Sequence, residues 1–160
     1  VAVSLRKKKT LHRNTMGLFD LFKKVPRIQD PLFGEMRYEV GFASGNTRFE
    51  PADKDVEVLV DCATDGPTQA QRDFFQKLQR DYPMLSSTCA EMITTEFRNW
   101  KEDFTIRDFP AEFTLVCIHI PENPDDKSEW TMSFTSIHDL NHHFEVAFIG
   151  DQAQHVQIDG

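Results

Sequence analysis

The stretch Val56–Tyr82, VEVLVDCATDGPTQAQRDFFQKLQRDY, contains the change of hydrophobic period that decides the fold class. In its first part every second residue is valine, which is typical of a half-buried β-strand. An Asp-Gly-Pro turn follows. Thr68 and Gln71 then have the spacing of a capping box, which predicts that a helix begins here. We therefore expect the chain to pass from sheet to helix within these residues.

Two helices are predicted after this turn. The first carries an apolar stripe formed by Phe74, Phe75, Leu78 and Tyr82. Pro83 is expected to end it, because proline removes a backbone donor and clashes with the preceding turn. A second stripe follows at Leu85, Cys89, Met92, Ile93, Phe97 and Trp100. Helical spacing in both stripes predicts an αα-hairpin that covers one face of a sheet.

Strand patterns lie on both sides of this hairpin. Before it, residues 35–42 alternate between polar and apolar, Ser44-Gly45-Asn46 has turn chemistry, and a return strand through Arg48 and Phe49 is expected. The other strands are predicted at residues 56–62, 112–120, 129–136, 143–149 and 155–158. The resulting order, βββ-αα-ββββ, predicts an α+β fold with a mostly antiparallel sheet and the hairpin packed on one face.

One domain is expected at residues 30–160. The chain has 160 residues, of which 39% are hydrophobic and 14 are Phe, enough for a core. Residues 1–29 are predicted to be a basic N-terminal extension with a short amphipathic segment, partly disordered, in which Pro26 and Pro31 bracket an extended linker. No apolar run approaches the roughly 18 residues of a membrane-spanning helix, so no transmembrane segment is expected.

The charge of the chain is divided between two regions. Residues 1–24 carry seven Lys and Arg against one Asp, whereas the remainder carries 25 acidic and 11 basic residues, a charge of −14. Such a body repels nucleic acid and attracts a basic protein. The candidate partner-binding residues are Asp53, Asp55, Glu57, Asp61, Asp125 and Asp126, which form one patch if their loops meet at one end of the sheet. The alternative is an ordinary solubilising surface.

An alternative function lies in the loop Ser136–His143. It contains His138, Asp139, His142 and His143, whose side chains are good ligands for zinc and similar metals. These four residues predict, as the alternative, a metal-dependent hydrolase. No HExxH or CxxC motif accompanies them, and a polar loop between strands explains the same residues. His119 is expected to be a hydrogen-bonded histidine of the sheet.

Other enzyme classes leave no pattern in the sequence. There is no G-x-S-x-G elbow, P-loop or G-x-G-x-x-G motif, and outward carboxylates such as Glu35, Glu39, Glu57 and Asp61 are what a solvated sheet face displays. The three cysteines form no CxxC pair, which favours buried thiols in a reducing cytoplasm. No cofactor is therefore predicted.

The layout also resembles a family of small uncharacterised bacterial α+β domains. The resembling features are Asp30-Pro31-Leu32-Phe33-Gly34, the helical region after Pro67, and the segments Asp139–Val146 and Ile158-Asp159-Gly160. Some members occur beside polymorphic toxins and are regarded as immunity proteins. The resemblance implies a cytoplasmic, non-enzymatic domain that binds and neutralises a toxin. An accessory role with homodimerisation is the third hypothesis.

Overall fold

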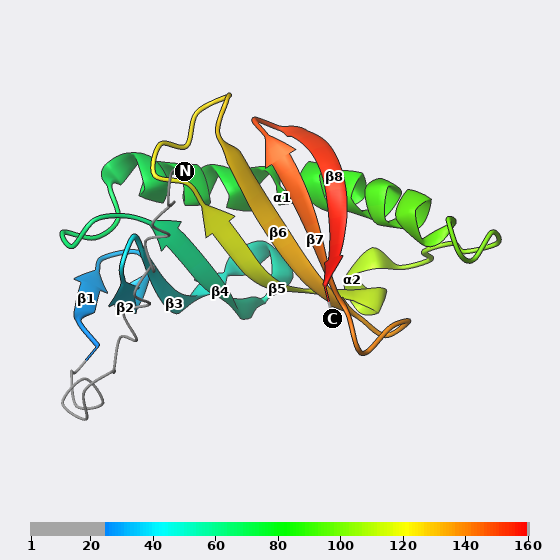
Figure 1. The fold of residues 1–160 in the computed structure, drawn as a ribbon, viewed down its shortest axis with the longest axis horizontal. Coiled ribbons are helices and arrows are strands. Elements are labelled where there is room, and N and C mark those ends of the chain that lie inside the picture. The colour runs from blue at the N-terminus through cyan, green and yellow to red at the C-terminus, as the bar shows by residue number, and fades with distance from the viewer. Residues whose placement is uncertain (1–24, 160) are drawn as a thin grey trace, which may run out of the picture.

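The computed structural model describes residues 25–159, so most of the predicted basic extension lies outside the described residues. One sheet forms the first layer and one long helix the second (Figure 1). The elements are β1 (Arg27–Asp30), β2 (Gly34–Glu39), β3 (Phe42–Phe49), the 3₁₀ helix η2 (Glu50–Ala52), β4 (Lys54–Asp61), α1 (Gln69–Phe97), α2 (Phe109–Glu112), β5 (Phe113–Ile120), β6 (Glu129–Ser136), β7 (His143–Ile149) and β8 (Gln152–Asp159). The fold is therefore α+β.

The eight strands follow one another across the sheet in the order of the chain. All neighbouring pairs are antiparallel except β4 and β5, which are parallel. A parallel pair needs a long crossover, and α1 supplies it between these two strands. Figure 1 shows α1 behind the sheet, along the longest axis of the molecule. Its buried apolar stripe consists of Phe75, Leu78, Tyr82, Leu85, Cys89, Ile93 and Phe97.

The start of α1 has the predicted capping box. The Thr68 hydroxyl accepts from the Gln71 N–H, and Gln71 Oε1 accepts from the Thr68 N–H at 2.9 Å. Gln71 is also fully buried, and its Nε2 donates to the carbonyl oxygens of Asp61 at 2.7 Å and Pro121 at 2.9 Å. These two carbonyls lie at the ends of β4 and β5. One side chain therefore joins the helix start to both strands of the parallel pair.

The predicted αα-hairpin is wrong, because α1 is a single helix of 29 residues that contains Pro83. Pro83 is exposed, whereas Tyr82 and Leu85 beside it are buried in the core. The apolar stripes on the two sides of the proline have the same phase and pack on the same sheet. Their burial outweighs the roughly 3 kcal/mol that an interior proline costs a helix.

The N-terminal strands also differ from the prediction. The expected linker before Pro31 forms β1, which pairs with β2. The chain reverses at Val40 and Gly41, where Val40 is 97% exposed and Gly41 has φ +97°. Positive φ favours glycine, so this position and not Ser44-Gly45-Asn46 makes the turn. The latter three residues lie inside β3 and pair with β4.

The second half of the sheet agrees with the sequence pattern. Trp130, Met132 and Phe134 of β6 face the core. The rings of Phe97 and Phe144 stack with centroids 5.1 Å apart, which fixes the end of α1 against β7. Among the described residues, no helix is long and apolar enough to cross a membrane.

Candidate functional site

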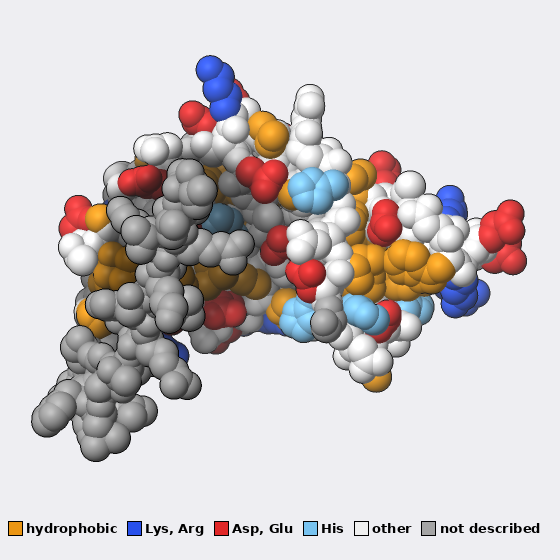
Figure 2. Space-filling model, in the orientation of Figure 1, with side chains coloured by type: hydrophobic (Ala, Val, Ile, Leu, Met, Phe, Trp, Pro, Cys, Tyr) orange, Lys and Arg blue, Asp and Glu red, His pale blue; other side chains and the backbone are white. Residues whose placement is uncertain are grey.

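The face of the sheet opposite α1, here called the open face, carries the candidate acidic residues of β4. Asp55 and Glu57 are exposed on it, whereas Val56 and Val58, which alternate with them, are at most 1% exposed on the helix side. In the part of the chain that the structure describes, no helix lies on the open face. Acidic and histidine side chains are visible there over the later strands in Figure 2. This face is therefore a broad polar surface.

Negative charge predominates on the open face of the described strands. The alternation of exposed and buried residues and the strand register place three arginines on it: Arg27, Arg37 and Arg48. The same criteria place eight carboxylates there: Glu35, Glu39, Asp55, Glu57, Asp61, Glu129, Glu145 and Asp159. Arg27 pairs with Glu35. The surface therefore has an excess of negative charge that complements a basic partner.

Glu145 is the carboxylate held most firmly on this face. Its Oε2 accepts from the Ser133 hydroxyl at 3.1 Å and from the Thr131 hydroxyl at 3.2 Å, both on the neighbouring strand β6. The cross-strand register brings Ser133 directly opposite Glu145. Glu145 is only half-buried, and both hydroxyls bond to Oε2, not to Oε1. The hydroxyls thus orient this side chain before any partner arrives.

Asp61 is positioned by a histidine of the adjacent strand. His119 Nε2 lies 3.0 Å from Asp61 Oδ1, and both side chains are partly exposed. His119 is thus a hydrogen-bonded residue of the sheet face, as the sequence predicts. The pair joins β4 and β5 on the open face, near the end of the parallel pair.

Cys117 lies on the same face but is a poor nucleophile. Burial raises the pKa of its thiol to about 12, and the neighbouring carboxylates of Glu57 and Glu145 act in the same direction. The reactive form of cysteine is the thiolate, which such a pKa suppresses at neutral pH. Cys89 is fully buried and burial also raises its pKa to about 12. Both thiols are therefore held in the protonated form at neutral pH.

The predicted acidic residues are not brought together in one patch. Asp53 precedes β4 and pairs with Arg48, whereas Asp125 and Asp126 follow β5. Because β4 and β5 are parallel, the two loops lie at opposite ends of the sheet. Asp125 also accepts from Ser128 and from the Lys127 N–H, and the Ser128 hydroxyl bond chiefly lowers its pKa. Asp55, Glu57 and Asp61 are the predicted residues that lie with Glu145 on the open face.

The histidine loop is divided into separate pairs. His138 Nε2 lies 2.6 Å from Glu112 Oε2, and its ring packs edge-on against Phe104 with centroids 5.0 Å apart. His142 Nδ1 bonds Asp139 Oδ2 at 2.8 Å, which chiefly lowers the pKa of Asp139. His143 begins β7, opposite Thr135.

These pairs give the metal interpretation no support from geometry. Within residues 25–159 no group of three or more His, Cys, Asp or Glu side chains is arranged to hold a metal ion. His138 instead connects the loop to α2 and to the aromatic core. The metal-dependent hydrolase remains a prediction that elemental analysis of the untagged protein tests.

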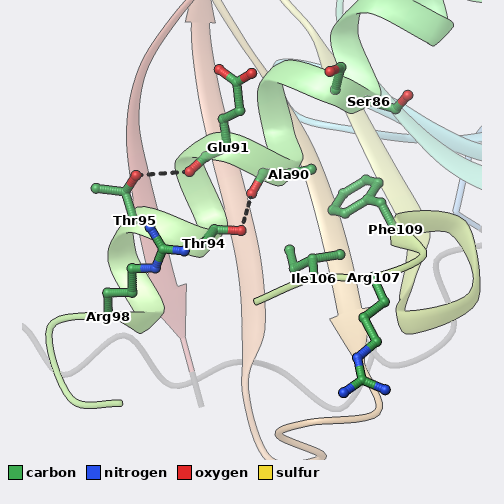
Figure 3. A pocket seen from close by; sticks show the side chains of 10 residues that line it. Ser86, Ala90, Glu91, Thr94, Thr95, Arg98, Ile106, Arg107 and Phe109 are labelled. Carbon is green, nitrogen blue, oxygen red and sulfur yellow. Dashed lines mark hydrogen bonds between the residues drawn. The ribbon is translucent and has the colours of Figure 1, made fainter. Parts of the chain in front are cut away.

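A shallow groove lies on the helix side, between α1 and the segment that leads to α2 (Figure 3). Its hydroxyls bond to the helix itself: Thr94 donates to the Ala90 carbonyl and Thr95 to the Glu91 carbonyl. The Arg98 guanidinium donates to the Phe104 carbonyl at 3.0 Å. The Thr94 and Thr95 hydroxyls and the Arg98 Nε thus have partners within the protein.

The sequence pattern alone did not identify Thr131, Ser133 and Glu145 as a unit. The outward hydroxyls of EWTMSFTS were visible as polar alternation, but only the register of β6 against β7 shows which carboxylate they contact. No family model, curated protein or solved structure matches this chain.

Proposed function

We propose that this chain is a non-enzymatic protein-binding module whose open face receives a basic surface of another protein. One observation carries the proposal: two hydroxyls hold the Glu145 carboxylate in place on the open face of the sheet. A side chain that is already ordered loses little conformational entropy when it pairs with a cation. Asp61, held by His119, has the same property.

The form of the surface supports a protein as the ligand. Small molecules bind in concave, mostly apolar pockets, whereas the open face is broad and lined with charges. Glu57 and Asp61 lie on β4 and Glu145 lies on β7, with β5 and β6 between them, so a ligand that pairs with all three must cover several strands. An excess of carboxylates over arginines favours a basic partner through charge complementarity and fast association.

The sharpest form of the proposal is a bacterial cytoplasmic protein that neutralises a basic toxin. The resemblance to the domains that occur beside polymorphic toxins supports this form. A toxin of this kind carries Lys and Arg on the surface that the open face covers. A basic partner that is not a toxin agrees with the proposed binding of a basic protein and contradicts only the proposed neutralisation of a toxin.

The test is capture of partners from a lysate of the native organism by three immobilised proteins. They are the wild type, the open-face variant Glu57→Gln/Asp61→Asn/Glu145→Gln, and the control variant Asp73→Asn/Glu91→Gln/Glu96→Gln on α1. Both variants remove three negative charges, so nonspecific attraction falls equally. Any captured protein is then purified and its Kd for each variant is measured.

We expect a partner that binds the wild type and the α1 control equally, with a Kd at least about tenfold higher for the open-face variant. Raising the salt concentration is expected to slow its association. A partner that binds all three proteins equally contradicts the proposal, and so does one lost equally from both variants.

A further inference from the structure

The strand β8 forms one outer margin of the sheet (Figure 1). It pairs with β7 on one side, and no described strand pairs with its other side. An outer strand presents unpaired N–H and C=O groups that serve as a template for another strand. The opposite margin, β1, has 4 residues, whereas β8 has 8. The long margin is the one suited to pairing with another chain.

Proteins usually protect such margins with lysine, proline, bulges or short strands. The β8 sequence, QAQHVQID, contains neither lysine nor proline. Its single irregularity is a register shift where Ala153 and His155 pair with successive residues of β7. From His155 to Asp159 the pairing with β7 is regular. The segment His155–Asp159 is therefore a regularly paired template that carries neither lysine nor proline.

We propose that this segment pairs antiparallel with the same segment of a second copy, about a two-fold axis at Gln157. In this register Gln157 lies opposite itself, His155 lies opposite Asp159 of the second copy, and Val156 lies opposite Ile158 of the second copy. Opposed residues on paired strands share a face, so each pair brings its side chains together. The two-fold axis produces every unlike pair twice.

The chemistry of this register is self-complementary on both faces. Gln157 and Asp159 lie opposite Glu145 and His143 of β7, which places them and His155 on the open face. The second copy therefore adds two His–Asp pairs there. Val156 and Ile158 are half-buried on the helix side, where the pairing adds two Val–Ile contacts. The proposed register therefore pairs histidine with aspartate on the open face and valine with isoleucine on the helix side.

Neighbouring registers lose this match. An axis at Val156 places His155 opposite Gln157 and Ile158 opposite Gln154. An axis at Ile158 places Gln157 opposite Asp159. Neither arrangement opposes histidine to aspartate or valine to isoleucine. Cross-strand pairs of opposite charge and of apolar side chains stabilise a sheet, so the axis at Gln157 is the favoured one.

An exposed apolar patch beside β8 lies where the second copy would cover it. Trp100 is 56% exposed and lines a hollow together with Val156 and Ile158. Hydrophobic side chains gather beside β8 in Figure 2. Pairing extends the helix side of the sheet at this margin with a second set of valine and isoleucine side chains. Apolar patches of this kind mark interaction surfaces.

Crosslinking tests the register. The variant Gln157→Cys places one thiol opposite itself, and Cα atoms opposed in an antiparallel pair are about 4.5–5.5 Å apart, within the range of a disulfide. We expect mild oxidation to convert it to a species of twice 18.5 kDa. The control Gln152→Cys lies outside the paired segment and is expected to form no disulfide-linked species, and neither is the wild type, whose own cysteines are buried or half-buried.

A charge exchange tests the pairing in sedimentation experiments. We expect the wild type to form dimers, and each single variant to weaken dimerisation about tenfold. His155→Glu opposes two carboxylates twice, and Asp159→Lys removes both His–Asp pairs. The double variant His155→Glu/Asp159→Lys restores opposite pairs and is expected to dimerise at least as well as the wild type. Equal circular dichroism spectra show that the variants are folded.

Three results overturn the proposal. They are a wild type that stays monomeric up to about 200 µM, well above a typical protein Kd; a dimer indifferent to both single substitutions; and a Gln157→Cys variant that crosslinks no more than Gln152→Cys. None of them affects the proposed binding of a basic protein, because that surface lies over β4–β7.

Discussion

At the scale of single residues, Asp30 joins the outermost N-terminal strand to α1. Its side chain is 1% exposed, and its Oδ2 accepts from Arg72 Nη2 at 2.8 Å and Nε at 3.0 Å. Its Oδ1 accepts from the N–H groups of Leu32 and Phe33. Burial alone would raise the pKa of this carboxyl, but the Arg72 and backbone hydrogen bonds together hold it below its ordinary value of 3.8.

The variant Asp30→Asn is expected to lower the free energy of unfolding by about 3 kcal/mol at pH 7, because it leaves a partly buried guanidinium without its counter-charge. A carboxyl with a lowered folded-state pKa stabilises the protein above its unfolded pKa. This contribution is lost as the pH falls through the folded value. Urea unfolding at several pH values should show a constant difference from pH 7 to about 5 that narrows below about 4. A difference that does not narrow at all between about pH 5 and pH 3 contradicts this account.

Gln71 allows a second stability test. Gln71→Leu retains the side-chain size but leaves the Asp61 and Pro121 carbonyls without this donor and removes half of the capping box. We expect the free energy of unfolding to fall by about 3 kcal/mol. The matched control is Gln76→Leu at an exposed position of the same helix, expected to change it by less than about 0.5 kcal/mol. Equal effects of both substitutions in urea unfolding would show that the bridge does not stabilise the fold.

The sequence predicted one of the two roles of Gln71. The spacing of Thr68 and Gln71 is local, so the capping box follows from the sequence alone. The contacts to Asp61 and Pro121 depend on β4 and β5 lying side by side, and Pro121 is 50 positions away in the chain. Such a contact has no local pattern.

At the scale of elements, Pro83 is the residue whose local preference the tertiary structure overrides. Pro83→Ala restores a backbone donor within α1 at an exposed position. We expect the free energy of unfolding to rise by about 1–3 kcal/mol. Thermal or urea unfolding measures this, with Met84→Ala, also exposed, as the control for a neighbouring substitution. A less stable Pro83→Ala variant would contradict this expectation.

The competition between local preference and tertiary packing also explains which elements could be predicted from the sequence. The strands β5, β6 and β7 have strong alternation or continuous apolar runs, and their positions were predicted correctly. At Val40, one apolar residue continued the alternation across a turn, so the predicted strand ran too far. Gly41, which has a φ of +97° in the turn, is the residue that indicates the end of this strand in the sequence.

At the scale of the whole molecule, the sequence predicted an acidic body but not the distribution of its charge. The loops at Asp53 and Asp125 are separated because β4 and β5 are parallel, a relation that follows from the single long helix between them. The prediction of two helices therefore did not indicate that β4 and β5 are parallel. The open face, with Glu145 among its central residues, follows from strand order and register. Those properties belong to the assembled sheet and not to any one segment.

The central claim is that the open face binds a basic protein, and carboxyl footprinting of the complex tests it most directly. A water-soluble carbodiimide and an amine label accessible carboxyl groups, which mass spectrometry then quantifies residue by residue. With the captured partner bound, we expect labelling of Glu57, Asp61 and Glu145 to fall at least about threefold, as for groups excluded from water in an interface. Labelling of Glu91 and Glu96 on α1 should stay unchanged. Protection of the α1 carboxyls with full labelling of the open face would contradict the account.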